Sequence, residues 1–234
     1  MSTSTIQFTE GFTGFFDSWE SMRRAVGTYE TDIRIYAENL LRLHTGKNDL
    51  NRRYKEVLGC LLLAGPDVAV LDLGGGLAVT YFAIKKMLHT SPPVRQWTVV
   101  DLPAIVAYGI TQLADDRLTF SAPEADVPCD VLLASHTLQY LPDPYEVLSQ
   151  LLRQRPRLVI FDELPLGSEV KFLVQKLPKA LGGSELPCQI LTHSKLDEVL
   201  RGYKRLVNKV LPDWCPVPGV KSYFRVYKLD EPDV

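Results

Sequence analysis

The chain has 234 residues, of which 46% are hydrophobic and 23% charged, and its formal net charge is −2. These values are typical of a globular protein with one domain, or with one domain and a small accessory part. The near balance of charge provides no basic footprint, so we expect no nucleic-acid partner. The sequence lacks the pattern of a signal peptide and any run of about 20 apolar residues, so we expect a cytoplasmic protein without a membrane span.

Four cysteines are spread along the chain and form no CxxC pair. Isolated thiols beside apolar residues are typical of buried free cysteines, and we expect neither a disulfide framework nor a structural zinc site. No expected helix carries His together with Asp or Glu at positions i and i+4, so the sequence predicts no metal site.

Residues 1–65 are expected to form a helical N-terminal cap or lid. Ser18 stands before an acidic first turn and predicts a helix N-cap. Apolar spacing predicts an amphipathic helix over 31–44, and a third helix is expected over 51–64. An aromatic group either covers the substrate or packs against the sheet; it consists of Phe12, Phe15, Phe16 and Trp19.

Residues 66–234 are expected to form the main domain, because short apolar runs alternate there with helical stretches. The expected strands are 68–73, 97–101, 117–120, 130–135 and 157–162, and the helices between them are 80–88, 104–113 and 144–152. Near-continuous apolar strands separated by helices predict a parallel sheet covered on both faces.

The C-terminal part shows a different pattern. Ser194 opens a helix with capping-box spacing. Alternating runs at 203–210 and 222–227, joined by a proline-rich link over 212–218, predict a closing hairpin. We therefore expect an α/β fold: a Rossmann-like, seven-stranded, mostly parallel sheet with helices on both faces, an antiparallel C-terminal hairpin and the helical cap.

A glycine-rich loop, Gly74-Gly75-Gly76, follows Asp72 where the first strand meets its helix. Open α/β sheets bind ligands at this carboxyl edge, and glycines let the backbone approach them closely. The dinucleotide fingerprint G-x-G-x-x-G/A fails at its third position, which is Val79. A carboxylate at Asp72 would repel a pyrophosphate but attract the ammonium and sulfonium of S-adenosylmethionine.

The second strand ends at Asp101, whose carboxylate can accept both hydroxyls of a cofactor ribose. Dinucleotide-binding folds share this feature. The structural alternative for Asp101 is a helix N-cap ahead of Pro103. We also assign Leu102 and the pair Ser135-His136, which end the second and fourth strands, to the cofactor site.

These motifs resemble class I S-adenosylmethionine-dependent methyltransferases over residues 66–228, with Ala78 in place of the last glycine. More narrowly, the chain resembles a little-characterised bacterial family often encoded among surface-polysaccharide biosynthesis genes. The segments that carry this narrower resemblance are Trp19-Glu20, Gly27-Thr28-Tyr29, residues 71–76, residues 100–103 and residues 162–166. The resemblance implies S-adenosylmethionine as cofactor and a saccharide-like or lipid-linked saccharide acceptor.

Methyl transfer to a hydroxyl needs positioning and a base. His136 is a candidate for the base or for a cofactor contact, and backbone hydrogen bonding is its structural alternative. Asp162 and Glu163 follow the fifth strand, and we expect only one of two adjacent acids to face the pocket. That one is a candidate to accept a substrate hydroxyl proton, and the other caps a helix or faces solvent. His193 is the weakest candidate, since it also suits a helix cap.

Gln139 and Tyr140 follow the fourth strand and are expected to line the pocket. Two other functions stay open at this stage. One is a catalytically inactive methyltransferase fold that serves as an interaction partner, and the other is an oxidoreductase that uses a nicotinamide dinucleotide. The sequence does not decide between a monomer and a dimer.

Overall fold

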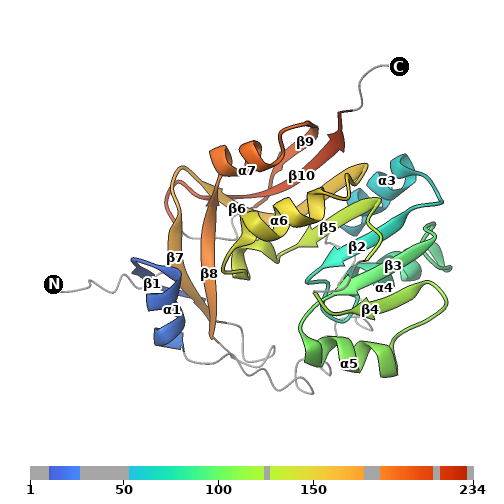
Figure 1. The fold of residues 1–234 in the computed structure, drawn as a ribbon, viewed down its shortest axis with the longest axis horizontal. Helices are drawn as coiled ribbons and strands as arrows, with labels where there is room; N and C mark the ends of the chain where they lie inside the picture. Colours follow the sequence, from blue (N-terminus) through green and yellow to red (C-terminus); the bar gives the residue numbers. More distant parts are fainter. Residues whose placement is uncertain (1–10, 27–52, 124–126, 177–184, 213–216, 231–234) are drawn as a thin grey trace.

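The computed structural model describes residues 11–26, 53–123, 127–176, 185–212 and 217–230 (Figure 1). The helix expected over 31–44, the first two residues of the helix expected over 51–64 and residues 213–216 of the proline-rich link lie outside this range.

A mixed sheet forms the centre of the protein, and its strands follow the expected pattern closely. They are β2 (Ala69–Leu73), β3 (Gln96–Val100), β4 (Leu118–Ser121), β5 (Val131–Ser135), β6 (Leu158–Gly167), β9 (Tyr203–Val210) and β10 (Lys221–Leu229). Their spatial order is β9-β10-β6-β5-β2-β3-β4. The neighbours from β4 to β6 are parallel, whereas β10 runs antiparallel to both β6 and β9. The seven-stranded arrangement and its C-terminal hairpin are therefore present, but within a larger sheet.

Three further strands extend this sheet to ten in the described residues. They are β1 (Phe12–Phe16), β7 (Lys171–Lys176) and β8 (Glu185–Thr192), in the order β1-β7-β8-β6. The end of β6 pairs in parallel with the end of β8, and β7 is antiparallel to its neighbours. Figure 1 shows β7 and β8 running across the direction of β5 and β2. The N-terminal segment, expected to be helical, thus contributes a strand as well.

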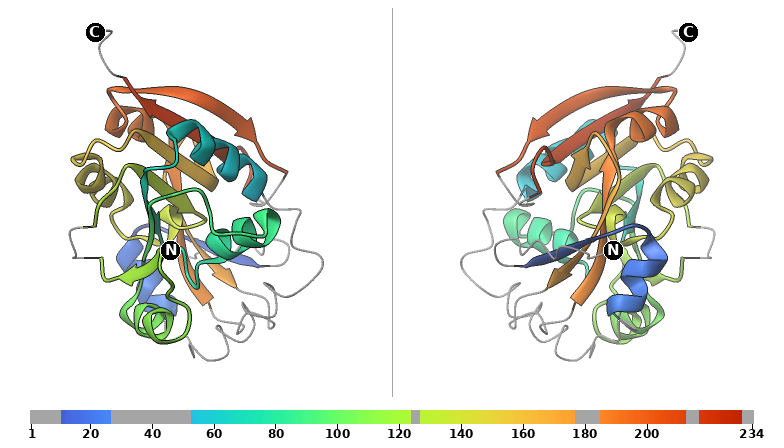
Figure 2. Two further views of the ribbon diagram at one scale, coloured as in Figure 1. Left: turned by 90° about the vertical axis from the view of Figure 1, so that its right-hand side faces the viewer. Right: turned by 90° about the vertical axis from the view of Figure 1, so that its left-hand side faces the viewer.

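Helices cover both faces of the central sheet, as expected. The helices α3 (Tyr54–Ala64), α4 (Val79–Leu88) and α5 (Pro103–Gln112) contribute to the core on one face, and α6 (Pro144–Leu152) and α7 (His193–Val199) to the core on the other. Alternate residues of β2 point into these two cores, Val70 into one and Leu71 into the other. Figure 2 shows α3 below the hairpin of β9 and β10, where Glu56 accepts a hydrogen bond from Lys209 at 3.0 Å.

The helix termini confirm one expected cap and correct another. Helix α1 (Trp19–Val26) follows Ser18, whose Oγ accepts a hydrogen bond from the Ser21 amide at 3.1 Å. Helix α7 was expected to open at Ser194, but it begins one residue earlier, at His193. Its N-cap is Thr192, which accepts from the Lys195 amide at 3.4 Å, because β8 continues directly into the helix.

Three of the cysteines are buried free thiols, namely Cys60, Cys129 and Cys188, and Cys215 lies outside the described residues. None of the helices within the described ranges is long and apolar enough to cross a membrane. The same part of the chain brings together no group of three His, Cys, Asp or Glu side chains suited to a metal ion.

Candidate active site

The glycine loop lies at the carboxyl end of β2, and its conformation requires glycine. Gly74 and Gly76 have φ values of +65° and +57°, a region that side chains disfavour. The Gly74 amide donates to the Val100 carbonyl at 2.8 Å, and the Gly76 amide donates to Asp101 Oδ2 at 2.9 Å. The loop is therefore fastened to the end of the neighbouring strand β3.

No space for a side chain remains at Gly74. A Cβ atom there would lie 2.3 Å from Cγ2 and 2.5 Å from Oγ1 of Thr137, in the loop after β5. Thr137, and not only a bound ligand, therefore excludes a side chain at Gly74. The same contact shows that the loop after β5 lies directly against the glycine loop.

Ala78 takes the place of the last glycine of the expected motif. It is fully buried, so it packs closely as expected, but its φ of 58° is left-handed. For an L-residue this conformation costs roughly 1–2 kcal/mol, so the substitution carries backbone strain at the start of α4.

Asp72 is buried beneath the loop. Its Oδ2 accepts a hydrogen bond from Trp97 Nε1 at 3.1 Å, and a Cβ at Gly75 would lie 2.5 Å from its carboxyl carbon. Its other oxygen, Oδ1, has no hydrogen-bond partner within the described part of the chain. Burial, and to a lesser degree the charge of Asp101, raise the pKa of Asp72 to about 7 in spite of the bond from Trp97. A buried carboxyl with one unpaired oxygen is suited to a cationic ligand group.

Asp101 holds the glycine loop and the start of α5 together. Besides the bond from Gly76, its Oδ1 accepts from the Leu102 amide at 2.7 Å. Burial raises the pKa of Asp101 against the effect of these two bonds. The N-cap of α5 is Leu102, with no capping side chain, so Asp101 is not the cap that the alternative interpretation proposed. Each oxygen has one amide donor and keeps a lone pair with which it can accept a ribose hydroxyl.

A second polar cluster lies where β5 ends beside the middle of the adjacent parallel strand β6. Ser135 stands opposite Asp162 in the register, and its Oγ donates to Asp162 Oδ2 at 3.1 Å. The His136 amide donates to the Asp162 carbonyl at 2.8 Å, and His136 Nδ1 lies 2.7 Å from Glu163 Oε2. We refer to Arg53, Ser135, His136, Asp162 and Glu163 as the polar cluster.

Both acids face the site, which corrects the expectation that only one would. The pairing of β6 with β10 shifts register between Tyr223 and Arg225, opposite Asp162 and Glu163, and Glu163 has a left-handed φ of 55°. This bulge interrupts the alternation of side chains along β6. As a result, both carboxylates accept hydrogen bonds from one guanidinium, Nε of Arg53 bonding to Asp162 and Nη2 to Glu163.

Charges around Glu163 keep it ionised. Burial alone would raise its pKa, but the hydrogen bonds and charges of His136 and Arg53 outweigh burial and lower the pKa of Glu163 to about 2. For Asp162, burial dominates over Arg53 and raises the pKa. An ionised carboxylate only accepts hydrogen bonds, so the proton between His136 and Glu163 lies on Nδ1. In a neutral imidazole with this tautomer, Nε2 is the acceptor nitrogen of the ring.

The backbone of the polar cluster is strained at two residues, one directly after β5 and one within β6. His136 and Glu163 have φ values of 54° and 55°, and neither is a glycine. Such conformations cost of order 1–3 kcal/mol each and concentrate at functional sites. Here the two strained residues are hydrogen-bonded to each other through their side chains, which supports a functional role for the pair.

The residues after His136 connect the polar cluster to the strand extension. The Tyr140 ring lies 5.5 Å from the His136 ring, and its hydroxyl donates to Gln175 Oε1 on β7. Gln139 is completely buried, and neither atom of its amide has a hydrogen-bond partner among the described residues. Tyr140 therefore contacts His136 of the polar cluster, whereas the expected place of Gln139 in the pocket wall stays a prediction.

His193 lies apart from the other candidates. Its Nδ1 is 2.8 Å from Nη2 of Arg225 on β10, and its ring packs edge-on against Tyr223 at 5.3 Å. Burial, followed by the charge of Arg225, lowers its pKa. These contacts fasten α7 to the sheet on the face opposite the one where α3 and Arg53 lie.

Sequence reasoning missed Arg53, Thr137 and Trp97. The partners of Arg53 lie 109 and 110 residues further along the chain, and no local pattern marks such a contact. The sequence contained a weak indication that Thr137 belongs to the site, because Thr137 follows His136 after a strand already assigned to the site.

Comparison with known proteins supports the fold. No protein-family model matches the chain, and no curated protein matches it in sequence. Among solved structures, 1,6-didemethyltoxoflavin-N1-methyltransferase of Burkholderia thailandensis, with bound 1,6-didemethyltoxoflavin and S-adenosylhomocysteine, matches with a TM-score of 0.54 at 15% identity. The match covers 97% of this chain and 99% of that one.

Two other solved structures show the same likeness. Human N-acetylserotonin methyltransferase, in complex with S-adenosylmethionine, matches with a TM-score of 0.52 at 15% identity, over 91% of this chain and 66% of that one. The CcbJ methyltransferase of Streptomyces caelestis matches with a TM-score of 0.51 at 13% identity, over 86% of this chain and all of that one (100%). The chain therefore has the fold of S-adenosylmethionine-dependent methyltransferases.

Proposed function

We propose that the protein is an S-adenosylmethionine-dependent methyltransferase. The observation that carries this proposal is that Thr137, the residue after His136 of the polar cluster, lies against the glycine loop, at the carboxyl edge of a sheet with the methyltransferase fold. A cofactor loop beside a histidine and carboxylate pair provides what methyl transfer to a protic acceptor needs.

The residues of the glycine edge fit the proposed cofactor. Asp101 would accept the ribose hydroxyls, and Leu102, which is 53% exposed, would pack against the adenine. The carboxyl of Asp72, buried beneath the loop, would attract the cationic groups of the cofactor through its charge. When bound, S-adenosylmethionine supplies an electrophilic methyl group on a sulfonium.

His136 is the proposed base. Glu163 holds the proton on Nδ1, so Nε2 would accept the proton of the acceptor hydroxyl while Glu163 stabilises the positive imidazolium. Asp162 is occupied by Arg53 and Ser135, and His193 by Arg225, so we propose no proton transfer through either.

The acceptor is proposed to be a hydroxyl of a saccharide-like or other small molecule. A protein of the same fold is named as an N1-methyltransferase, so the preference for oxygen depends on the polar cluster rather than on the fold. Arg53 already serves two carboxylates, which disfavours an anionic acceptor here. The division into a cap of residues 1–65 and a cofactor-binding domain of residues 66–234 is part of this proposal.

Titration calorimetry separates this function from the two alternatives. We expect S-adenosylmethionine and S-adenosylhomocysteine to bind and NAD not to bind; the reverse result would favour an oxidoreductase. The rate of transfer of a labelled methyl group to a panel of hydroxyl compounds then tests the chemistry. His136→Ala should lower turnover by roughly 10²–10⁴-fold and leave cofactor affinity within a few-fold. Cofactor binding without transfer to any compound of the panel would favour an inactive interaction protein.

A further inference from the structure

Arg53 stands immediately before α3 and reaches across to the middle of β6. Its guanidinium is largely buried, with 14% of the side chain exposed, and it contacts the two adjacent acids of the bulge. Burial opposes its charge, but the two carboxylates raise the pKa of Arg53 further, so the group stays ionised. The chain thus places one permanent positive charge between two carboxylates that would otherwise repel each other.

We propose that Arg53 is a positioning residue of the methyl-transfer reaction, acting through Glu163 on the imidazole of His136. The inference rests on the proposed role of His136 as the base. Arg53 holds the Glu163 carboxylate in one orientation, with Oε1 toward the guanidinium and Oε2 toward Nδ1 of His136. That orientation keeps the ring proton on Nδ1, the tautomer that the proposed role of His136 requires.

The geometry requires an arginine rather than a lysine. Nε bonds to Asp162 and Nη2 to Glu163, so two edges of one planar group serve two carboxylates. An ammonium group is a single point charge and cannot hold both carboxylates in fixed, separate directions. Without Arg53, Glu163 would lose a charged hydrogen-bond partner that it has among the described residues, and it could turn away from Asp162.

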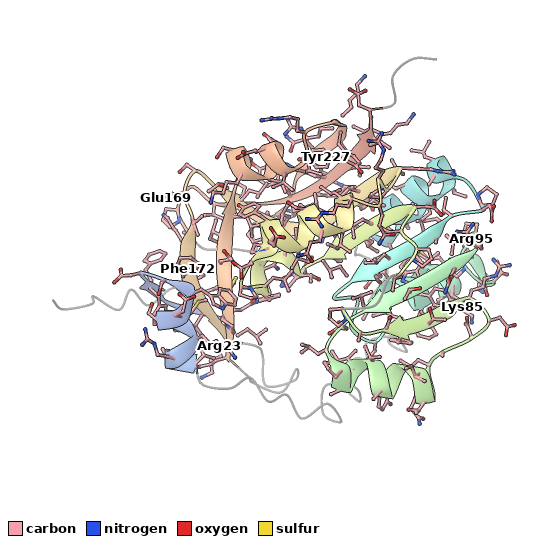
Figure 3. All side chains as sticks on the ribbon, viewed as in Figure 1. Arg23, Lys85, Arg95, Glu169, Phe172 and Tyr227 are labelled. Carbon is pink, nitrogen blue, oxygen red and sulfur yellow. The ribbon has the colours of Figure 1, made fainter. Side chains whose placement is uncertain are left out.

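A purely structural role is the competing explanation, because Arg53 also links α3 to the sheet. A more exposed arginine that also contacts two carboxylates provides a control. Arg95 likewise serves two carboxylates, Asp130 at 3.2 Å and Asp67 at 3.7 Å, but these lie before the strands β5 and β2, at the opposite edge of the sheet. Figure 3 shows Arg95 at the end of the molecule away from β7, where Phe172 is labelled.

The test reads the tautomer of His136 by ¹⁵N nuclear magnetic resonance of the imidazole, with the signal assigned by its loss in His136→Gln. Spectra are recorded with and without S-adenosylhomocysteine, under mildly alkaline conditions. We expect the parent and Arg95→Gln to show a single tautomer with the proton on Nδ1. Arg53→Gln should show a mixture of tautomers, and Arg53→Lys should restore only part of the parent signal.

Glu163→Gln calibrates the readout, because an amide can donate to Nδ1 and should move the proton to Nε2. Thermal unfolding of each variant confirms that it is folded. A parent-like tautomer in folded Arg53→Gln, even with lowered stability, would show that Arg53 is only structural and would overturn the proposal. An unchanged tautomer in Glu163→Gln would overturn it too. Failure of S-adenosylhomocysteine to bind the parent would instead refute the proposed function. The two failures can be told apart, because the spectra of the ligand-free protein do not depend on cofactor binding.

Discussion

The carboxyl group of Asp72, which we propose contacts the cofactor, carries a cost in stability. It is completely buried, one oxygen is unpaired in the described structure, and its pKa is raised to about 7, chiefly by burial. The folded protein therefore holds a proton that the unfolded chain releases near pH 4. Stability is lost as the pH rises from about 4 to about 7, and a bound ammonium group would remove this cost.

We expect Asp72→Asn to flatten this pH dependence while weakening cofactor binding. From pH 5 to pH 8, the parent should lose about 1–3 kcal/mol more of its free energy of unfolding than Asp72→Asn does. Denaturant unfolding at the two pH values measures this shift. Asp115→Asn is the control, because hydrogen bonds, led by that from Lys85, outweigh burial and lower the pKa of Asp115 to about 2, so it does not titrate in this range. Parallel profiles for parent and Asp72→Asn would contradict the argument.

The sequence was a good guide to single residues where the local pattern determines their position. Asp101 follows a strand, and that alone placed it at the glycine edge. The orientation of Glu163 could not be predicted, because it depends on a bulge in the pairing of β6 with β10. Arg53 was missed because a lone arginine gives no sign of a partner more than 100 residues away.

At the level of elements, the prediction was reliable where helices and buried strands alternate. The helix over 144–152 was predicted with the bounds that α6 has in the structure. By contrast, β7 and β8 were not predicted. Proline interrupts β8 at Pro187, β7 is only partly buried, and β7 also pairs with the distant strand β1, a non-local interaction that no sequence period reveals.

The contact between the loops after β2 and β5 is the element-level feature that brings cofactor loop and polar cluster together. Gly74→Ala should lower the free energy of unfolding by about 1–3 kcal/mol and weaken cofactor binding, because of its positive φ and the clash with Thr137. Combining it with Thr137→Ala should recover part of this loss, since the double variant relieves the clash but not the backbone strain. A double-mutant cycle of unfolding free energies measures the coupling.

Gly59→Ala is the control for this cycle. Gly59 lies within α3 without a positive φ, and a Cβ atom there would enter open space among the described residues. Alanine at this position should therefore be neutral or stabilise the helix by up to about 1 kcal/mol. Additive effects of Gly74→Ala and Thr137→Ala would mean that the two loops do not constrain each other.

On the scale of the whole molecule, the proposed cofactor site draws on three neighbouring strands. The glycine loop follows β2, Asp101 follows β3, and Ser135 ends β5. A ligand bound across these strand ends would link elements that come from distant parts of the chain. Because such a ligand binds the folded state only, it should stabilise the entire domain rather than one loop.

We therefore expect S-adenosylhomocysteine to raise the Tm of the protein. At a ligand concentration of 100 times Kd, the stabilisation should be about 2.7 kcal/mol, which corresponds to roughly 5–11 °C for a domain of this size.

Asp101→Ala leaves the ribose hydroxyls without a charged acceptor and should weaken binding by about 1–3 kcal/mol. With a loss of about 2 kcal/mol, the same ligand concentration would stabilise the variant by only about 0.9 kcal/mol. Calorimetric melting of both proteins, with NAD as the control ligand, measures these shifts. Equal shifts in parent and Asp101→Ala would show that Asp101 does not bind the cofactor, and a shift with NAD alone would refute the proposed cofactor.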